Sequence, residues 1–269
     1  MPDDALMRQV LKELESLRGN VNRGRKAEIP ISLGSYLSDF LALPHLRGFW
    51  PGSSFYQGAT LFDVTGQARH LASTGTTMQA LLYNDLIPYL DFTAANNDYL
   101  TRSDEAGLDI TGAITLGGWC WWDAAGIPGV TNRPFITKEP TTTYSPYQIY
   151  MEDAASQRVV ARFSDSDAGT NIVTPVTTGA VSLSAWHCVI ADCVPGGTAR
   201  LTVDGVEYTA SAAALASLYN SSGAFEIGRG FGGTHLLDGR AAFCFLCANV
   251  LPANMKDVLW KRGKILFGV

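Results

Sequence analysis

The chain has 269 residues, of which 46% are hydrophobic and 17% charged, an ordinary composition for a globular protein with a sizeable core. Its formal net charge of -5 argues against a general nucleic-acid binder, because the positive field that attracts phosphate backbones is missing. No apolar run is long enough to span a bilayer, so membrane insertion is not expected. The N-terminus lacks the basic start and apolar centre of a secretory signal peptide.

Residues 1–22 are predicted to form an oligomerising or docking helix. Asp3 or Asp4 can cap it, and good helix formers fill its body. Apolar residues recur at spacings of three and four, as in a coiled coil. Because so short a helix is marginal alone, its apolar stripe needs a partner, and a homotrimer is favoured. The alternative is a helix packed on its own domain. The stripe consists of Met7, Val10, Leu14, Leu17 and Val21.

Residues 23–39 are polar and contain Gly24, which predicts a tether. From residue 40 onward, short apolar or alternating runs lie between turn signals, and the chain carries 27 glycines and 12 prolines. This spacing predicts many short strands in a sandwich or barrel. Asp204 and Gly205 predict a tight hairpin turn, and PANMKDVLWKRG predicts one short helix near the end. Residues 40–269 are therefore expected to form one domain.

Several segments, in this order, resemble the concanavalin A-like, laminin-G-like jelly-roll family. LFDVTGQARHL resembles a D-x-S/T-G turn, PYLDFTAANNDYL a strand before an Asn-Asp-Tyr turn, and LGGWCWW a strand ending in a buried tryptophan. SAWHCVIADC, LTVDG, FEIGRG and LLDGRAAFCFLC resemble the strands and turns that follow. The resemblance covers more than four-fifths of the chain. It implies a mostly β, two-sheet antiparallel jelly-roll sandwich with a short N-terminal α-helix.

This fold hosts lectins, adhesion modules, glycoside hydrolases and purely structural domains, so it does not fix a function. A short oligomerising helix, a tether and one such domain resemble bacteriophage virion proteins, such as capsid decorations, head fibres and tail receptor-binding proteins. The resemblance implies a virion location and other virion proteins as partners. The alternative is a carbohydrate-binding or adhesion module of a cellular protein, and a glycoside hydrolase is less favoured.

The sequence gives no support for an enzyme. A glycosidase needs two carboxylates facing one groove, but Glu152 and Asp153 are adjacent and should point to opposite faces of a strand. Asp165 and Asp167 have a suitable spacing, yet SDSDAGT is typical of a turn. None of the four histidines has a serine or cysteine in a recognisable nucleophile motif, and His187 is interpreted as structural.

Two other motifs are interpreted as structural. The four cysteines in two pairs, Cys188 with Cys193 and Cys244 with Cys247, could provide four zinc ligands. Odd separations place the members of each pair on opposite faces of a strand, which favours buried free thiols. GRGFGG contains a G-x-G-x-x-G pattern, but a turn and a strand follow it where a dinucleotide site needs a helix. It is expected to be a loop.

Calcium is the only cofactor that the sequence suggests. Oxygen donors gather in DFTAANND, and the candidate ligands are Asn96, Asn97 and Asp98. The same side chains could instead complete a tight turn through their own hydrogen bonds. Both interpretations are open at this point.

A cell-surface glycan is the expected ligand, because sugar rings stack on flat aromatic faces beside polar groups. Trp121, Trp122, Tyr144, Tyr147 and Tyr150 surround a long loop that is rich in proline and threonine. Trp122, Tyr144 and Tyr147 are the predicted ligand-binding residues. Alternation places Trp121 and Trp122 on opposite faces, so one of these rings should lie in the core. Core packing or a trimer contact is the alternative for the whole set.

Overall fold

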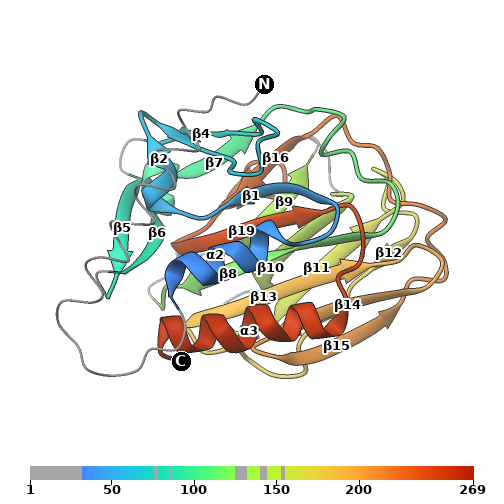
Figure 1. Cartoon of the computed structure of the whole chain (residues 1–269). Coiled ribbons are helices and arrows are strands. Elements are labelled where there is room, and N and C mark those ends of the chain that lie inside the picture. Colours follow the sequence, from blue (N-terminus) through green and yellow to red (C-terminus); the bar gives the residue numbers. More distant parts are fainter. Residues whose placement is uncertain (1–31, 76–77, 85, 125–131, 140–143, 153–154) are drawn as a thin grey trace.

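The computed structural model describes residues 32–75, 78–84, 86–124, 132–139, 144–152 and 155–269. They form two stacked antiparallel sheets with two helices on one side (Figure 1). This confirms the predicted mostly β sandwich.

The first sheet, sheet A, has eight strands, in the order β15-β14-β13-β8-β19-β6-β5, with β1 also paired to β19. Its strands are β1 (Leu46–Trp50), β5 (Gln79–Tyr83), β6 (Ile87–Phe92), β8 (Ile114–Trp122), β13 (Trp186–Cys193), β14 (Thr198–Val203), β15 (Val206–Ser211) and β19 (Gly239–Cys247).

The second sheet, sheet B, has nine strands, in the order β12-β11-β10-β9-β16-β7-β4-β3-β2. A separate hairpin joins β17 (Arg229–Gly230) to β18 (His235–Leu236), and short 3-10 helices span Ser53–Phe55 and Ala94–Asn96. The strands of sheet B are β2 (Tyr56–Gln57), β3 (Thr60–Leu61), β4 (Leu71–Thr74), β7 (Tyr99–Arg102), β9 (Asn132–Glu139), β10 (Tyr147–Glu152), β11 (Val159–Ser164), β12 (Ile172–Val173) and β16 (Ala224–Ile227).

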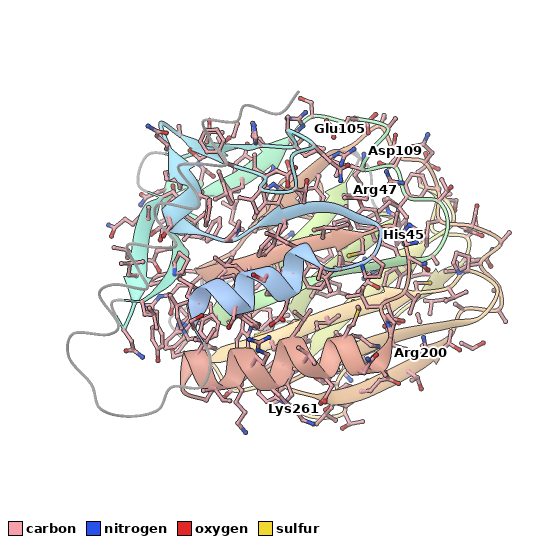
Figure 2. All side chains as sticks on the ribbon, in the orientation of Figure 1. His45, Arg47, Glu105, Asp109, Arg200 and Lys261 are labelled. Atoms are coloured by element: carbon pink, nitrogen blue, oxygen red, sulfur yellow. The ribbon has the colours of Figure 1, made fainter. Side chains whose placement is uncertain are left out.

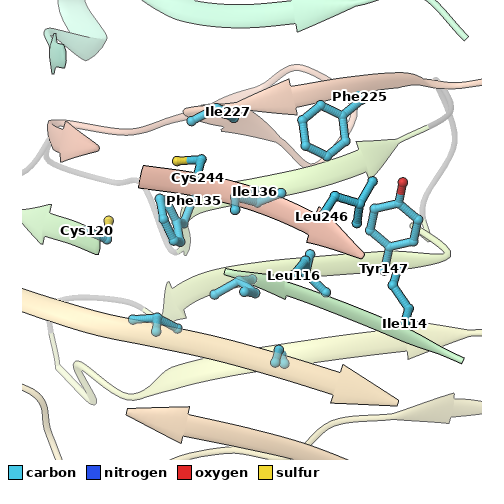
Figure 3. Packing of buried hydrophobic residues seen from close by; sticks show 14 of the residues in the cluster. Ile114, Leu116, Cys120, Phe135, Ile136, Tyr147, Phe225, Ile227, Cys244 and Leu246 are labelled. Carbon is cyan, nitrogen blue, oxygen red and sulfur yellow. The ribbon is translucent and has the colours of Figure 1, made fainter. Parts of the chain in front are cut away.

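The main core lies between the two sheets, where each strand turns alternate side chains inward. Leu116 of β8, Phe135 of β9, Tyr147 of β10 and Phe225 of β16 meet in this layer (Figure 3). Each is completely buried.

A second apolar layer covers the outer face of sheet A. Helices α2 (Leu33–Leu41) and α3 (Ala253–Phe267) pack there against Trp119, Phe243 and neighbouring side chains. Tyr36 connects the layer through hydrogen bonds: its hydroxyl donates to the Leu259 carbonyl at 2.8 Å and accepts from the Trp119 indole at 2.8 Å. Both faces of the central strands β8 and β13 are therefore buried, which fits their mostly apolar composition.

Helix α2 corrects the predicted tether of residues 23–39. Ser32 caps the helix, its hydroxyl accepting from the Ser35 amide at 3.2 Å, and Tyr36, Leu37 and Phe40 are buried against sheet A. These apolar residues repeat with a helical period, so they bind the segment to the domain. The predicted helix of residues 1–22 and the first part of the tether lie outside the described residues.

Two local predictions from the sequence are confirmed. Asp204 and Gly205 both have positive φ angles, 51° and 81°, and join β14 to β15 in a tight turn. The predicted C-terminal helix is α3, which extends to Phe267 and ends at Gly268, whose φ is 70°.

One cation lies at the margin of the core. Lys138 is completely buried, and its ammonium contacts Asp104 at 2.5 Å and Asp109 at 3.1 Å. It also donates to the carbonyls of Ser221 and Gly223 at 2.8 and 2.6 Å. These four acceptors compensate a charge that burial would otherwise make costly. Figure 2 shows Asp109 near the upper edge of the molecule in that view.

Candidate functional site

The outer face of sheet B differs from that of sheet A. The two described helices both cover sheet A, whereas sheet B carries polar and aromatic side chains on its outer side. In β10, Tyr147, Ile149 and Met151 face the core, so Gln148 and Tyr150 face outward. Both side chains are nonetheless buried, so a ligand on this side of the sheet would contact the partly exposed groups around them.

Strand β11 adds a cation to this face. Val159, Ala161 and Phe163 point into the core, which places Arg162 on the outer side. In the ladder, Arg162 pairs with Gln148, so it lies diagonally across from Tyr150. Its guanidinium donates to the Tyr150 hydroxyl at 2.9 Å and lies 5.2 Å from the centre of that ring.

A loop between β17 and β18 adds a second ring to this arrangement. Phe231 packs edge-on against Tyr150 with ring centres 5.0 Å apart, and the guanidinium of Arg162 lies 5.7 Å from the Phe231 ring. His235 contacts Phe231 at 4.9 Å between ring centres. Tyr150 is buried, whereas the other members are half-buried. We call Tyr150, Arg162, Phe231 and His235 the Arg162 cluster.

The backbone of this loop is strained where it presents Phe231. Phe231 has a φ of 56°, a conformation that costs a bulky residue roughly 1–3 kcal/mol. Gly232 and Gly233 follow with φ angles of 69° and 78°, which glycine adopts freely. The GRGFGG segment thus forms strand β17 and the turn after it, where a loop was predicted, and the turn holds an aromatic ring over the sheet.

Arg229 fastens the loop to the sheet. Its guanidinium pairs with the buried carboxylate of Glu226 and lies 4.0 Å from the centre of the Tyr99 ring. Its carbonyl accepts from the Thr137 hydroxyl of β9 at 2.8 Å. These contacts anchor the base of the hairpin, so the Arg162 cluster stands on a rigid support.

Two of the three predicted glycan-binding residues are in the wrong place for that role. Trp122 and Tyr147 are completely buried, because their faces of β8 and β10 line the core between the sheets. Tyr147 is among the core side chains in Figure 3. Alternation itself holds: Trp121 faces outward from β8 and is half-buried. Tyr144 is half-buried, and its part in ligand binding stays a prediction.

The predicted calcium loop is a hydrogen-bonded turn. Asp98 is buried, and its carboxylate accepts from the Thr93 amide at 3.1 Å. Asn97 takes a left-handed conformation with a φ of 55° and is exposed, while Asn96 is half-buried. These contacts match the alternative in which the side chains complete a turn. Within the described residues, no three His, Cys, Asp or Glu side chains gather as a metal site. Calcium binding stays a prediction.

The two members of each cysteine pair face opposite sides of sheet A, as their spacing predicted. Cys193 and Cys244 belong to the core between the sheets, whereas Cys188 and Cys247 face the helices. All five cysteines are buried and free, and burial raises the pKa of the Cys247 thiol to about 12. Thiols held in the neutral form are poor metal ligands and poor nucleophiles.

The structure brings His187 next to a serine, which the sequence did not predict. The Nε2 atom of His187 lies 3.1 Å from the Ser182 hydroxyl, and its Nδ1 lies 2.6 Å from the Asp204 carboxylate. However, Nε2 also lies 2.9 Å from the Ser182 carbonyl oxygen, which can only accept. Both ring nitrogens of His187 thus have partners, and which nitrogen carries the proton depends on the tautomer. His187 links the segment around Ser182, which precedes β13, to the β14–β15 turn, and this fits its predicted structural role.

Two of the acidic residues considered for glycoside hydrolysis, Glu152 and Asp165, have structural partners. Glu152 pairs with Arg158 at 2.7 Å, and Asp165 accepts from the Asn171 amide and side chain at 3.2 and 2.6 Å. Such partners orient carboxylates within turns and strand ends. Asp153 lies outside the described residues.

Sequence reasoning missed Arg162 and Phe231. Alternation in RVVARF already placed Arg162 opposite the apolar residues of β11, so the face could be predicted. The approach of the GRGFGG loop depends on contacts across the sheet, which no local pattern encodes. Tyr150 was among the aromatic candidates but was not selected.

No family model and no curated protein matches this chain. Solved structures are similar in fold. The binding domain of Paraclostridial Mosquitocidal Protein 1 aligns with a TM-score of 0.63 at 11% identity, over 82% of this chain and 52% of that chain.

Two structures of the binding domain of botulinum neurotoxin DC are also similar. The complex with rat synaptotagmin II has a TM-score of 0.60 at 9% identity, over 81% of this chain and 51% of that one. The complex with SialylT has a TM-score of 0.56 at 9% identity, over 82% and 52%. This chain thus spans about half the length of each, and the likeness establishes the β-sandwich fold.

None of the described helices is long and apolar enough to cross a membrane.

Proposed function

We propose that this protein is a non-enzymatic binding module that recognises a glycan on the outer face of sheet B. The observation that carries the proposal is the Arg162 cluster, in which a strained loop holds Phe231 beside a guanidinium, both half-buried on the outer side of sheet B. An aromatic ring offers a flat surface for a sugar ring, and a guanidinium offers several donors for sugar oxygens. The similarity to toxin binding domains supports a binding role.

The setting that we propose is a bacteriophage virion, where the domain would serve as a capsid decoration, head fibre or tail receptor-binding protein. The resemblance of the chain's organisation to such proteins supports this setting. A homotrimer joined through residues 1–22 would present three weak sites on one stalk and gain avidity.

The second candidate is an adhesion or carbohydrate-binding module of a cellular protein. The solved structures with similar folds favour it, because they are binding domains of toxins. The two candidates share the same binding face and differ in the assembly that carries it.

A glycan array with the intact protein tests the proposed face. We expect the wild-type protein to give signals that Phe231→Ala reduces at least tenfold, since the flat surface is lost. Tyr208→Ala on β15 is the matched control, because Tyr208 is a half-buried ring on the other sheet. Tyr144→Ala tests the remaining sequence prediction in the same assay. Absence of glycan signals from the wild-type protein, or equal losses in Phe231→Ala and Tyr208→Ala, would contradict the proposal.

A further inference from the structure

Arg162 differs from most of the other described arginines, although Arg133 also lacks a carboxylate and donates to the Asp123 carbonyl instead. Most of them have a carboxylate within hydrogen-bond distance, and none of the described carboxylates forms an ion pair with Arg162. Its Nε atom is buried and has no hydrogen-bond partner within the described part of the chain. The arginines with a carboxylate are Arg69, Arg102, Arg158, Arg200, Arg229, Arg240 and Arg262.

Arg240 on sheet A provides a direct comparison. Its guanidinium also lies between two aromatic rings, 4.6 Å from the centre of Trp121 and 5.4 Å from that of Tyr89. Arg240 is paired with Asp91 at 3.0 Å, whereas within the described residues the guanidinium of Arg162 donates to the neutral Tyr150 hydroxyl alone. Within the described residues, the two settings therefore differ in the negative charge that neutralises the cation.

We infer that the missing anion is supplied by the ligand, and that Arg162 binds the carboxylate of an acidic sugar. This inference rests on the proposed glycan-binding function and specifies the chemical class of the ligand. A planar guanidinium matches a carboxylate in geometry and charge, and partial burial strengthens the pairing. Phe231 would contact the apolar face of the same sugar, so the cluster recognises charge and ring together.

The net charge of the protein gives this site a role in selectivity. With a formal charge of -5, the whole molecule does not attract anions at long range. Discrimination for an acidic sugar must therefore arise at short range, from a cation that is open to the ligand. We therefore predict that a preference for acidic over neutral sugars depends on Arg162.

Titration calorimetry with matched sugars tests the inference. The probes are sialyllactose and its methyl ester, and a galacturonic acid oligomer with its methyl ester, so that each pair differs only in the charge of the carboxylate. For the wild-type protein we expect at least one free acid to bind about tenfold more tightly than its ester, the change typical of a lost charged hydrogen bond. Arg162→Met should bind acid and ester equally, while the control Arg240→Met keeps the preference.

Two further results separate the possible failures. If neutral sugars bind the wild-type protein as tightly as the acids, the inference is wrong and the proposed glycan-binding function stands. If no sugar binds, and the glycan array is also silent, the proposed function fails as well. Arg162→Lys keeps the charge but loses the planar donor pair, so it should retain only part of the preference. Circular dichroism spectra that match those of the wild type confirm that each variant is folded.

Discussion

At the residue scale, single polar side chains determine how the loops of this sandwich close. Asp63 is buried, and its carboxylate accepts hydrogen bonds from the amides of Phe49, Thr65 and Arg69. The Thr65 hydroxyl donates to it as well, at 2.7 Å. The D-x-T-G segment that resembles the jelly-roll family is thus a structural turn, which one carboxylate organises.

His70 completes this turn and makes it sensitive to pH. Its Nδ1 accepts a hydrogen bond from the Asp63 amide at 3.1 Å, which requires that Nδ1 carries no proton. Burial is the main reason that the pKa of His70 lies below its usual value of 6.5, and the nearby Arg102 lowers it further. A histidine with a lowered pKa contributes stability that is present above the unfolded pKa and is lost as the pH falls through the folded pKa.

We therefore predict that the free energy of unfolding decreases when the pH is lowered from 7.5 to 5.5. His70→Asn retains an acceptor near Nδ1 but does not titrate, so its unfolding free energy should depend less on pH. Burial also lowers the pKa of His235, which leaves part of the dependence in the variant. Urea unfolding at both pH values measures the difference, and identical pH dependence in the two proteins would show that His70 does not contribute.

At the element scale, a buried ion pair connects helix α3 to sheet A. Lys256 of α3 contacts Asp192 of β13 at 2.7 Å, and both side chains are almost completely buried. Arg200 also reaches Asp192, at 3.0 Å. Figure 2 shows Arg200 beside one end of α3, where this pairing lies.

We predict that Lys256→Met destabilises the protein by less than the roughly 3–5 kcal/mol typical of an uncompensated buried charge. Arg200 still neutralises Asp192, which limits the loss. The control is Lys261→Met on the same helix, where an exposed pair with Asp257 should change stability by about 0.5 kcal/mol or less. Urea unfolding measures both variants, and equal effects would show that the buried pair does not anchor α3.

At the scale of the whole molecule, the two described helices cover the outer face of sheet A, whereas the outer side of sheet B carries the half-buried Arg162 cluster. Helix α2 begins at Leu33, so the chain enters the domain on the side of sheet A (Figure 1).

We predict that deleting residues 1–21 converts an oligomer, with a trimer favoured, into a monomer. The apolar residues from Met7 to Val21 would be removed, while the described domain stays intact. Light scattering of the two proteins measures the mass in solution. An unchanged oligomer after the deletion, or a monomeric full-length chain, would rule out the predicted role of this segment.

The sequence by itself determined the strands, the hairpin at Asp204 and the opposite faces of the cysteines, because alternation and turn chemistry are local. It did not determine which face of a strand meets solvent. Trp122 is buried and Arg162 is partly open because each strand joins a particular sheet, and α2 and α3 cover only one of the two sheets. Phe231 reaches Tyr150 through a contact between residues distant in sequence. Only tertiary packing decides such contacts, since local patterns fix the direction of a side chain but not what lies opposite it.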